Sequence, residues 1–90
     1  MKRKSIFEIS KEELAETFAE RVRNLRTSAG MTQQELGDII GLSKQAINDI
    51  EKCRRLTSIY NAIRIANYFN TTVDYLSGIV DDPTLQYHDK

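Results

Sequence analysis

The stretch from Ser43 to Lys52 places polar side chains on one side of an expected helix and apolar side chains on the other. Ammonium, amide and carboxylate groups in such a row are suited to hydrogen bonding and charge pairing. A basic loop from Lys52 to Leu56 follows directly. The outer polar positions are Lys44, Gln45, Asn48 and Asp49, and the inner apolar positions are Ala46, Ile47 and Ile50.

The chain offers no comparable set of residues for catalysis or for a metal. Cys53 is the only cysteine and His88 the only histidine, and they lie far apart in the sequence. No nucleophile–base set, catalytic carboxylate pair or glycine-rich phosphate loop is evident. We therefore expect no enzyme activity, no metal, no cofactor and no small-molecule ligand. Cys53 is then an inert thiol and His88 is incidental.

The formal net charge is zero, but the charges are unevenly distributed along the chain. Between Arg21 and Arg64, eight basic side chains stand against four acidic ones, a local excess of +4. The first twenty residues sum to −1, and the residues from Ile65 onward sum to −3. Because a surface that faces phosphates needs only local positive charge, overall neutrality does not exclude a nucleic-acid partner.

Length and composition indicate one small domain. The chain has 90 residues, of which 40% are hydrophobic, enough for a modest core. A single cysteine rules out an internal disulfide. The basic start lacks the apolar segment of a signal peptide, and no apolar run approaches the ~20 residues that span a membrane. We expect a cytoplasmic protein.

Hydroxyl residues mark where helices should begin. Ser10 with Glu13, and Thr32 with Glu35, form two capping boxes. The first box opens a helix over roughly 11–29. The second opens a helix of about two turns that Gly41 should end. Ser43 then caps a third helix, over about 43–52.

Two further helices complete the expected fold. Ser58 can cap a fourth helix, which Asn70 should end in a left-handed conformation. Thr72 can cap a short fifth helix, closed by Gly78. In the fourth helix we expect Ile59, Ile63, Ala66 and Phe69 to face inward, and in the fifth Val73 and Leu76.

The organisation is therefore all-α, with five helices in a compact domain. Residues 1–20 form an N-terminal extension that includes the start of a long first helix. Residues 21–78 form the main domain. Residues 79–90 form a polar tail that we expect to fray.

A specific spacing runs through the second and third helices. It consists of Gln33, the small Gly37, Gly41 at the turn, and the aliphatics Ile47 and Ile50. This spacing resembles the helix-turn-helix of phage-repressor and Cro-like (XRE-type) transcription regulators. The small residue lets the two helices approach closely, and the glycine permits a left-handed turn.

The resemblance covers about Arg21 to Gly78. RVRNLR (21–26) is similar to the family's first helix, MTQ (31–33) to its entry into the second, and IE (50–51) to its exit from the third. IRIANYFNTTVDYLSG (63–78) is similar to its closing helices. The resemblance implies a lambda-repressor-like DNA-binding domain.

Three positions depart from the family's pattern. Gly37 stands where the family prefers Ala, which should weaken the helix by up to ~1 kcal/mol. Cys53 stands where Gly often ends the third helix, so that turn is expected to be longer or mildly strained. Thr57 stands where Pro usually precedes the fourth helix, so the loop is less rigid.

The resemblance implies roles for individual residues. Gln33, at a helix N-terminus, would hold a phosphate. Residues at the start of the third helix would read bases, with Gln or Asn on adenine and Lys on guanine or phosphate. Asp49 would accept from cytosine or exclude a phosphate. Arg26 and Glu51 would form a structural ion pair. The implied DNA-binding set is Gln33, Ser43, Lys44, Gln45, Asn48, Asp49, Lys52, Arg54 and Arg55.

The function so implied is a sequence-specific DNA-binding regulator, a repressor that binds a pseudo-palindromic operator as a homodimer. We expect the dimer contact on the fourth and fifth helices, with Tyr75, Leu76 and Ile79. The alternative is an antitoxin or anti-repressor that uses the same fold to bind a protein partner. An exposed Ile39 and the acidic chain ends would favour that alternative.

Two apolar residues before the first helix leave a further choice open. Phe7 and Ile9 precede the cap at Ser10 and could close over it as a hydrophobic staple. With Leu14 and Phe18 they would make the first helix longer and cover the core. The other reading of the same residues is an arm that binds a partner.

Overall fold

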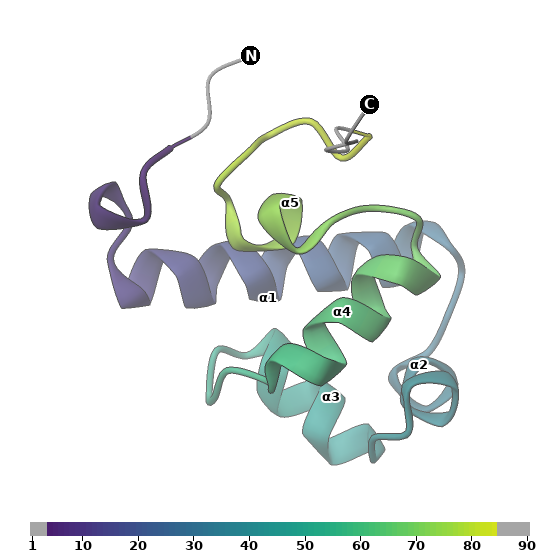
Figure 1. The fold of residues 1–90 in the computed structure, drawn as a ribbon. Coiled ribbons are helices and arrows are strands. Elements are labelled where there is room, and N and C mark those ends of the chain that lie inside the picture. Colours follow the sequence, from purple (N-terminus) through teal and green to yellow (C-terminus); the bar gives the residue numbers. More distant parts are fainter. Residues whose placement is uncertain (1–3, 85–90) are drawn as a thin grey trace.

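The computed structural model describes residues 4–84 and confirms the all-α prediction, with no strand in that range. A short 3-10 helix, η1, precedes five α-helices (Figure 1). Helices α2 and α3 lie together at one end of the molecule, on the far side of α4 from α5 (Figure 1). The elements are η1 (Ile6–Glu8), α1 (Lys11–Ser28), α2 (Gln33–Ile40), α3 (Lys44–Glu51), α4 (Ile59–Tyr68) and α5 (Val73–Ser77).

Every α-helix begins at the hydroxyl residue that the sequence marks. In each, the N-cap side chain accepts a hydrogen bond from the backbone N–H three residues later. This removes one of the unpaired donors that a helix N-terminus leaves. Helices as short as α2, α3 and α5 do not persist alone in water, so their stability comes from caps and packing. The caps are Ser10, Thr32, Ser43, Ser58 and Thr72.

The core takes one fully buried side chain from each helix. Each of the five has no more than a trace of exposed surface, and they belong to a single cluster. Removing any one of them would therefore open a cavity that touches several helices. The five are Val22, Leu36, Ile47, Ile65 and Leu76.

Helix α4 turns a different side toward the core from the one expected. Ile59 is 69% exposed and Ile63 is 46% exposed, so their assignment to the core is wrong. The buried side is formed by Ala62, Ile65 and Ala66. Both stripes of this helix are apolar, so hydrophobic periodicity does not distinguish them. The small alanines allow close approach to the other helices, which decides the orientation.

The expected dimer contact at Leu76 is also wrong, because that side chain is fully buried in the core. The expected fraying of the tail is wrong for its first two residues. Val80 is 1% exposed, and the Ile79 carbonyl accepts a hydrogen bond from the Lys4 N–H at 2.9 Å. His88 lies outside the described residues.

Arg21 fastens this C-terminal segment to α1. Its guanidinium donates hydrogen bonds to the backbone carbonyls of Tyr75 and Val80 and forms an ion pair with Asp81 at 2.9 Å. The same group stacks 4.2 Å above the centre of the Tyr75 ring. Arg21 thus adds a second donor to the Tyr75 carbonyl in the last turn of α5 and supplies one to the Val80 carbonyl just after it.

A backbone contact holds α2 close to α3. The Gly37 carbonyl accepts from the N–H groups of Gly41 and Leu42, at 2.7 and 2.8 Å. A Cβ atom at Gly37 would collide with the Leu42 carbonyl oxygen. Gly41 adopts φ +88°, the left-handed conformation that the turn requires. The expectation that a small residue at position 37 lets the two helices approach closely is therefore confirmed.

An ion pair joins α1 to the end of α3. The Arg26 Nε and Nη2 atoms donate to the two carboxylate oxygens of Glu51 at 2.7 and 2.9 Å. Both side chains are largely buried, with 12% and 3% exposed. Arg26 Nη1 also donates to the Met31 carbonyl at 2.8 Å, so the same guanidinium holds the link into α2.

We expect Gly37→Ala to destabilise the protein by about 1–3 kcal/mol, because its methyl group overpacks the turn. This outweighs the ~1 kcal/mol gain in helix propensity. Chemical denaturation measures the change. Gln34→Ala, at an exposed position of the same helix, is the control and should shift stability by less than about 0.5 kcal/mol. A Gly37→Ala protein as stable as the original would contradict the close approach.

We expect Arg26→Met to cost about 3–5 kcal/mol in the free energy of unfolding, because it leaves the buried Glu51 carboxylate without its cation. The double variant Arg26→Met/Glu51→Leu should recover most of that loss, since neither charge then remains buried. The two urea denaturation curves provide the comparison. A loss below about 1 kcal/mol in the single variant would show that the pair does not hold α3.

Candidate nucleic-acid interface

Helix α3 divides into a buried side and an outer side. Ala46, Ile47, Ile50 and Glu51 are buried against the rest of the domain. On the outer side, Lys44 and Gln45 are exposed, while Asn48 and Asp49 are half-buried. Ser43 is exposed, and its hydroxyl accepts from the Ala46 N–H at 3.0 Å. The structure thus brings the first five candidate positions of α3 onto one surface.

Asp49 organises part of this surface. Its Oδ1 atom accepts from Gln45 Nε2 at 2.9 Å and lies 3.4 Å from an Arg54 guanidinium nitrogen. Arg54 therefore offsets the negative charge that Asp49 would otherwise present to a phosphate. The amide oxygen of Gln45 and the ammonium group of Lys44 make no hydrogen bond or ion pair within residues 4–84, so they remain available.

Gln33 connects the start of α2 to α3. Its Nε2 atom donates to Asn48 Oδ1 and to Glu51 Oε1, each at 3.2 Å. The side-chain amide nitrogen is thus occupied inside the protein. What Gln33 offers outward is its backbone N–H in the first turn of α2, where the helix dipole favours an anion.

The basic loop after α3 is exposed. Lys52, Arg54 and Arg55 all lie on the surface. Between them Cys53 adopts φ +59°, a left-handed conformation that costs a non-glycine residue on the order of 1–2 kcal/mol. The expectation of a mildly strained turn is confirmed. The Arg54 N–H bonds to the Asp49 carbonyl at 2.9 Å, which closes the turn.

Several basic residues counted in the local excess are engaged in contacts within the domain. Arg21 and Arg26 make the internal contacts described above. Arg64 donates to the Tyr60 hydroxyl at 2.9 Å and to the Ile39 carbonyl at 3.2 Å. The Arg26–Glu51 pair is expected from the resemblance, whereas no sequence pattern indicates the partners of Arg21, which lie up to 60 positions away. The cations left exposed by α3 and its loop are Lys44, Lys52, Arg54 and Arg55.

The Arg26–Glu51 pair also sets the local electrostatics. The hydrogen bond to Glu51 raises the pKa of Arg26 above its ordinary value, against the opposing effect of burial. The guanidinium is therefore charged at any physiological pH. Because its charge is matched by Glu51, it adds no net positive charge behind α3.

No cluster of three or more potential metal ligands occurs among residues 4–84. Within the same range, every buried side-chain nitrogen and oxygen has a hydrogen-bond partner. None of the helices described is long and apolar enough to cross a membrane.

Curated relatives match the same part of the chain. An uncharacterized HTH-type transcriptional regulator of Archaeoglobus fulgidus is 37% identical over 65 residues, which cover 72% of this chain and 91% of the relative. The control protein C.SmaI of Serratia marcescens is 31% identical over 64 residues, 71% of this chain and 76% of the relative. The uncharacterized HTH-type regulator YobD of Bacillus subtilis is 27% identical, and the match spans 59% of its length.

A solved structure agrees with the fold. The restriction-modification controller protein C.AhdI from Aeromonas hydrophila superposes with a TM-score of 0.63 at 27% identity, covering 69% of this chain and 94% of that one. A family model described as helix-turn-helix matches residues 22–76, more than half of the chain. The chain therefore belongs to the helix-turn-helix family of DNA-binding transcription regulators, in its phage-repressor and Cro-like branch.

Proposed function

We propose that this protein is a sequence-specific repressor that binds a pseudo-palindromic operator as a homodimer, with α3 in the major groove. One observation carries the proposal. The outer side of α3 bears the exposed Lys44 and Gln45, which take no part in the core, while its inner side is fixed by the core and by the Arg26–Glu51 pair. A rigid helix with an uncommitted polar side is what base reading requires.

Each residue on that side has a role in the proposal. Lys44 and Gln45 lie in the first turn of α3, the end that enters the groove. Gln45 pairs with adenine, and Lys44 contacts guanine or a phosphate. Asn48 approaches a base edge next to Gln45, and Asp49 orients Gln45. Ser43, the backbone N–H of Gln33, and the loop cations contact the DNA backbone.

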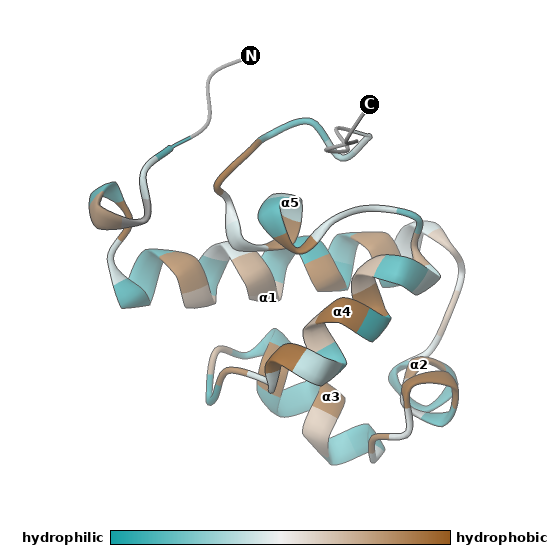
Figure 2. Cartoon of the chain, viewed as in Figure 1, coloured by the Kyte–Doolittle hydropathy of each residue, from teal (hydrophilic) through white to brown (hydrophobic). Residues whose placement is uncertain are grey.

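The dimer contact in this proposal lies on α4. Ile59, Tyr60 and Ile63 form an exposed apolar face, at 69%, 64% and 46% exposure. Arg64 is the only charged residue of α4, and it contacts Tyr60. Much of α4 is accordingly coloured as hydrophobic (Figure 2). Two copies related by a two-fold axis would place their α3 helices on half-sites about 34 Å apart.

A protein-binding antitoxin or anti-repressor is the second candidate. Ile39 is 41% exposed at the end of α2, and exposed carboxylates line the first half of α1. Both features are available to a protein partner. A protein partner bound to these two features would leave the polar side of α3 without a role. The DNA-binding proposal therefore accounts for more of the structure.

Selection from a random duplex library should recover a palindromic motif with the wild-type protein. The variant Lys44→Ala/Gln45→Ala should lose that motif while remaining folded, because both side chains are exposed. Lys11→Ala/Asn24→Ala removes an ammonium and an amide group from exposed positions of α1 and should retain the motif. Failure of the folded wild-type protein to enrich any sequence would contradict the proposal and direct the search to protein partners.

The salt dependence of operator binding should report the loop cations. Three exposed cations in each protomer, Lys44, Lys52 and Arg55, have no carboxylate partner within residues 4–84 and give a slope of log K against log salt of about −5 for a dimer. Lys52→Ala/Arg55→Ala should reduce that slope by about 3 to 4 and leave the preferred sequence unchanged. A wild-type slope flatter than about −2 would show that the loop does not meet the phosphates.

A further inference from the structure

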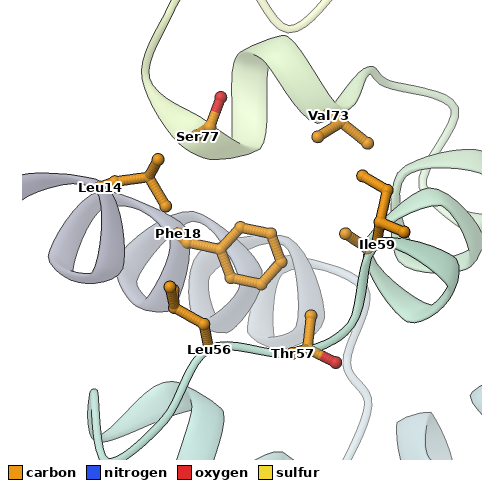
Figure 3. A pocket seen from close by; sticks show the side chains of 8 residues that line it. Leu14, Phe18, Leu56, Thr57, Ile59, Val73 and Ser77 are labelled. Atoms are coloured by element: carbon orange, nitrogen blue, oxygen red, sulfur yellow. The ribbon is translucent and has the colours of Figure 1, made fainter. Parts of the chain in front are cut away.

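An apolar groove opens between the first half of α1, the start of α4 and α5. The Phe18 ring lies at its floor, with Leu14, Leu56, Ile59 and Val73 around it (Figure 3). Its volume is about 250 Å³, and none of its lining residues is charged. Nothing among residues 4–84 fills it, so its walls retain apolar surface that an occupant could bury.

The size of the groove limits what can occupy it. Small-molecule sites usually measure about 300–1,000 Å³, so this groove lies below that range. An apolar cavity of ~150 Å³ accepts benzene. The groove therefore suits one aromatic side chain with its Cβ atom. The Phe18 ring offers such a side chain an offset or edge-to-face contact.

The chain itself carries an unpartnered aromatic residue. Phe7 in η1 is 96% exposed, so the expectation that it staples α1 is wrong. Its position is fixed by local hydrogen bonds, from the Ser5 N–H to Glu8 Oε1 at 2.7 Å and from the Phe7 N–H to Ser5 Oγ at 3.2 Å. The Lys4 bond to Ile79 anchors the segment before it. These contacts leave Phe7 exposed to solvent, on a segment that lies beyond the start of α1 (Figure 1).

The exposed face of α4 alone offers too little area for a stable dimer, and Phe7 with the groove can add to it. A standard interface buries ~800 Å² on each partner. At ~200 Å² for a fully exposed side chain, Ile59, Tyr60 and Ile63 together offer only about 360 Å². Phe7 adds roughly 190 Å², and the groove walls, apart from Ile59 which is already counted, add only some tens of Å². The total then reaches roughly 600 Å² per protomer, the lower end of the range for specific interfaces.

We propose that the occupant of the groove is Phe7 of a second copy of this chain, with the exchange repeated in the opposite direction. Ile59 belongs both to the groove and to the exposed α4 face, so the two contacts are continuous. The inference rests on the proposed homodimer and adds a reciprocal arm contact to it. The N-terminal arm is then part of the dimer interface rather than of the DNA-binding surface.

Sedimentation equilibrium of the full chain tests this contact. Phe7→Ala should weaken dimerisation on the order of 100-fold, because two rings leave each dimer. The fold should be unaffected at a position 96% exposed. Tyr68→Ala is the control. Tyr68 is an exposed aromatic on the opposite side of α4 from Ile59, and its removal should leave the dimer constant unchanged.

A photocrosslinker identifies the occupant directly. With p-benzoylphenylalanine in place of Phe7, irradiation should give a covalent dimer whose crosslink maps to the peptide from Leu56 to Ala62 or to α1 near Phe18. A crosslink to the groove within one chain would overturn the exchange, and so would an unchanged dimer constant in Phe7→Ala. A wild-type protein that stays monomeric overturns it as well. If that protein still selects a DNA motif, the regulator survives without the arm contact.

Discussion

The buried pair of Arg26 and Glu51 is the interaction on which the arrangement of the helices depends. A carboxylate that is 3% exposed is stable only when its oxygens are matched by donors. Arg26 supplies two, and the Gln33 amide supplies a third. Since these residues belong to α1, α2 and α3, one charge pair fixes two helices that are each only eight residues long. The N-caps allow these two helices to form, and the Arg26–Glu51 pair determines where they lie.

The parts of the fold that depend on neighbouring residues could be predicted from the sequence. An N-cap side chain bonds to the backbone N–H three residues later, so each helix start can be predicted from a few neighbouring residues, as at Thr32 and Ser43. The left-handed turn at Gly41 could likewise be predicted, from the glycine at that position. The outer side of α3 was also predictable, because its apolar positions leave only one polar side.

What the sequence could not supply depends on distant contacts. Helix α4 has two apolar stripes, and only the packing of Ala62 and Ala66 shows which one faces inward. Arg21 belongs to a basic stretch by sequence, yet it binds carbonyls more than 50 residues away. The hydrogen bonds of Gln33 and Asp49 likewise change which polar groups these candidate residues can present to DNA. No local sequence pattern predicts these hydrogen bonds. The DNA-binding roles themselves remain predictions.

The separation of α3 into two independent sides has an evolutionary consequence. The residues that keep the helix in place, such as Ile47 and Glu51, are not the residues that project from it, such as Lys44 and Gln45. Substitutions at the projecting positions leave the core volume and the buried charges unchanged. A duplicated copy could therefore drift to a new target through neutral intermediates, with each step folding as well as the last. In this domain, stability and recognition can evolve almost separately.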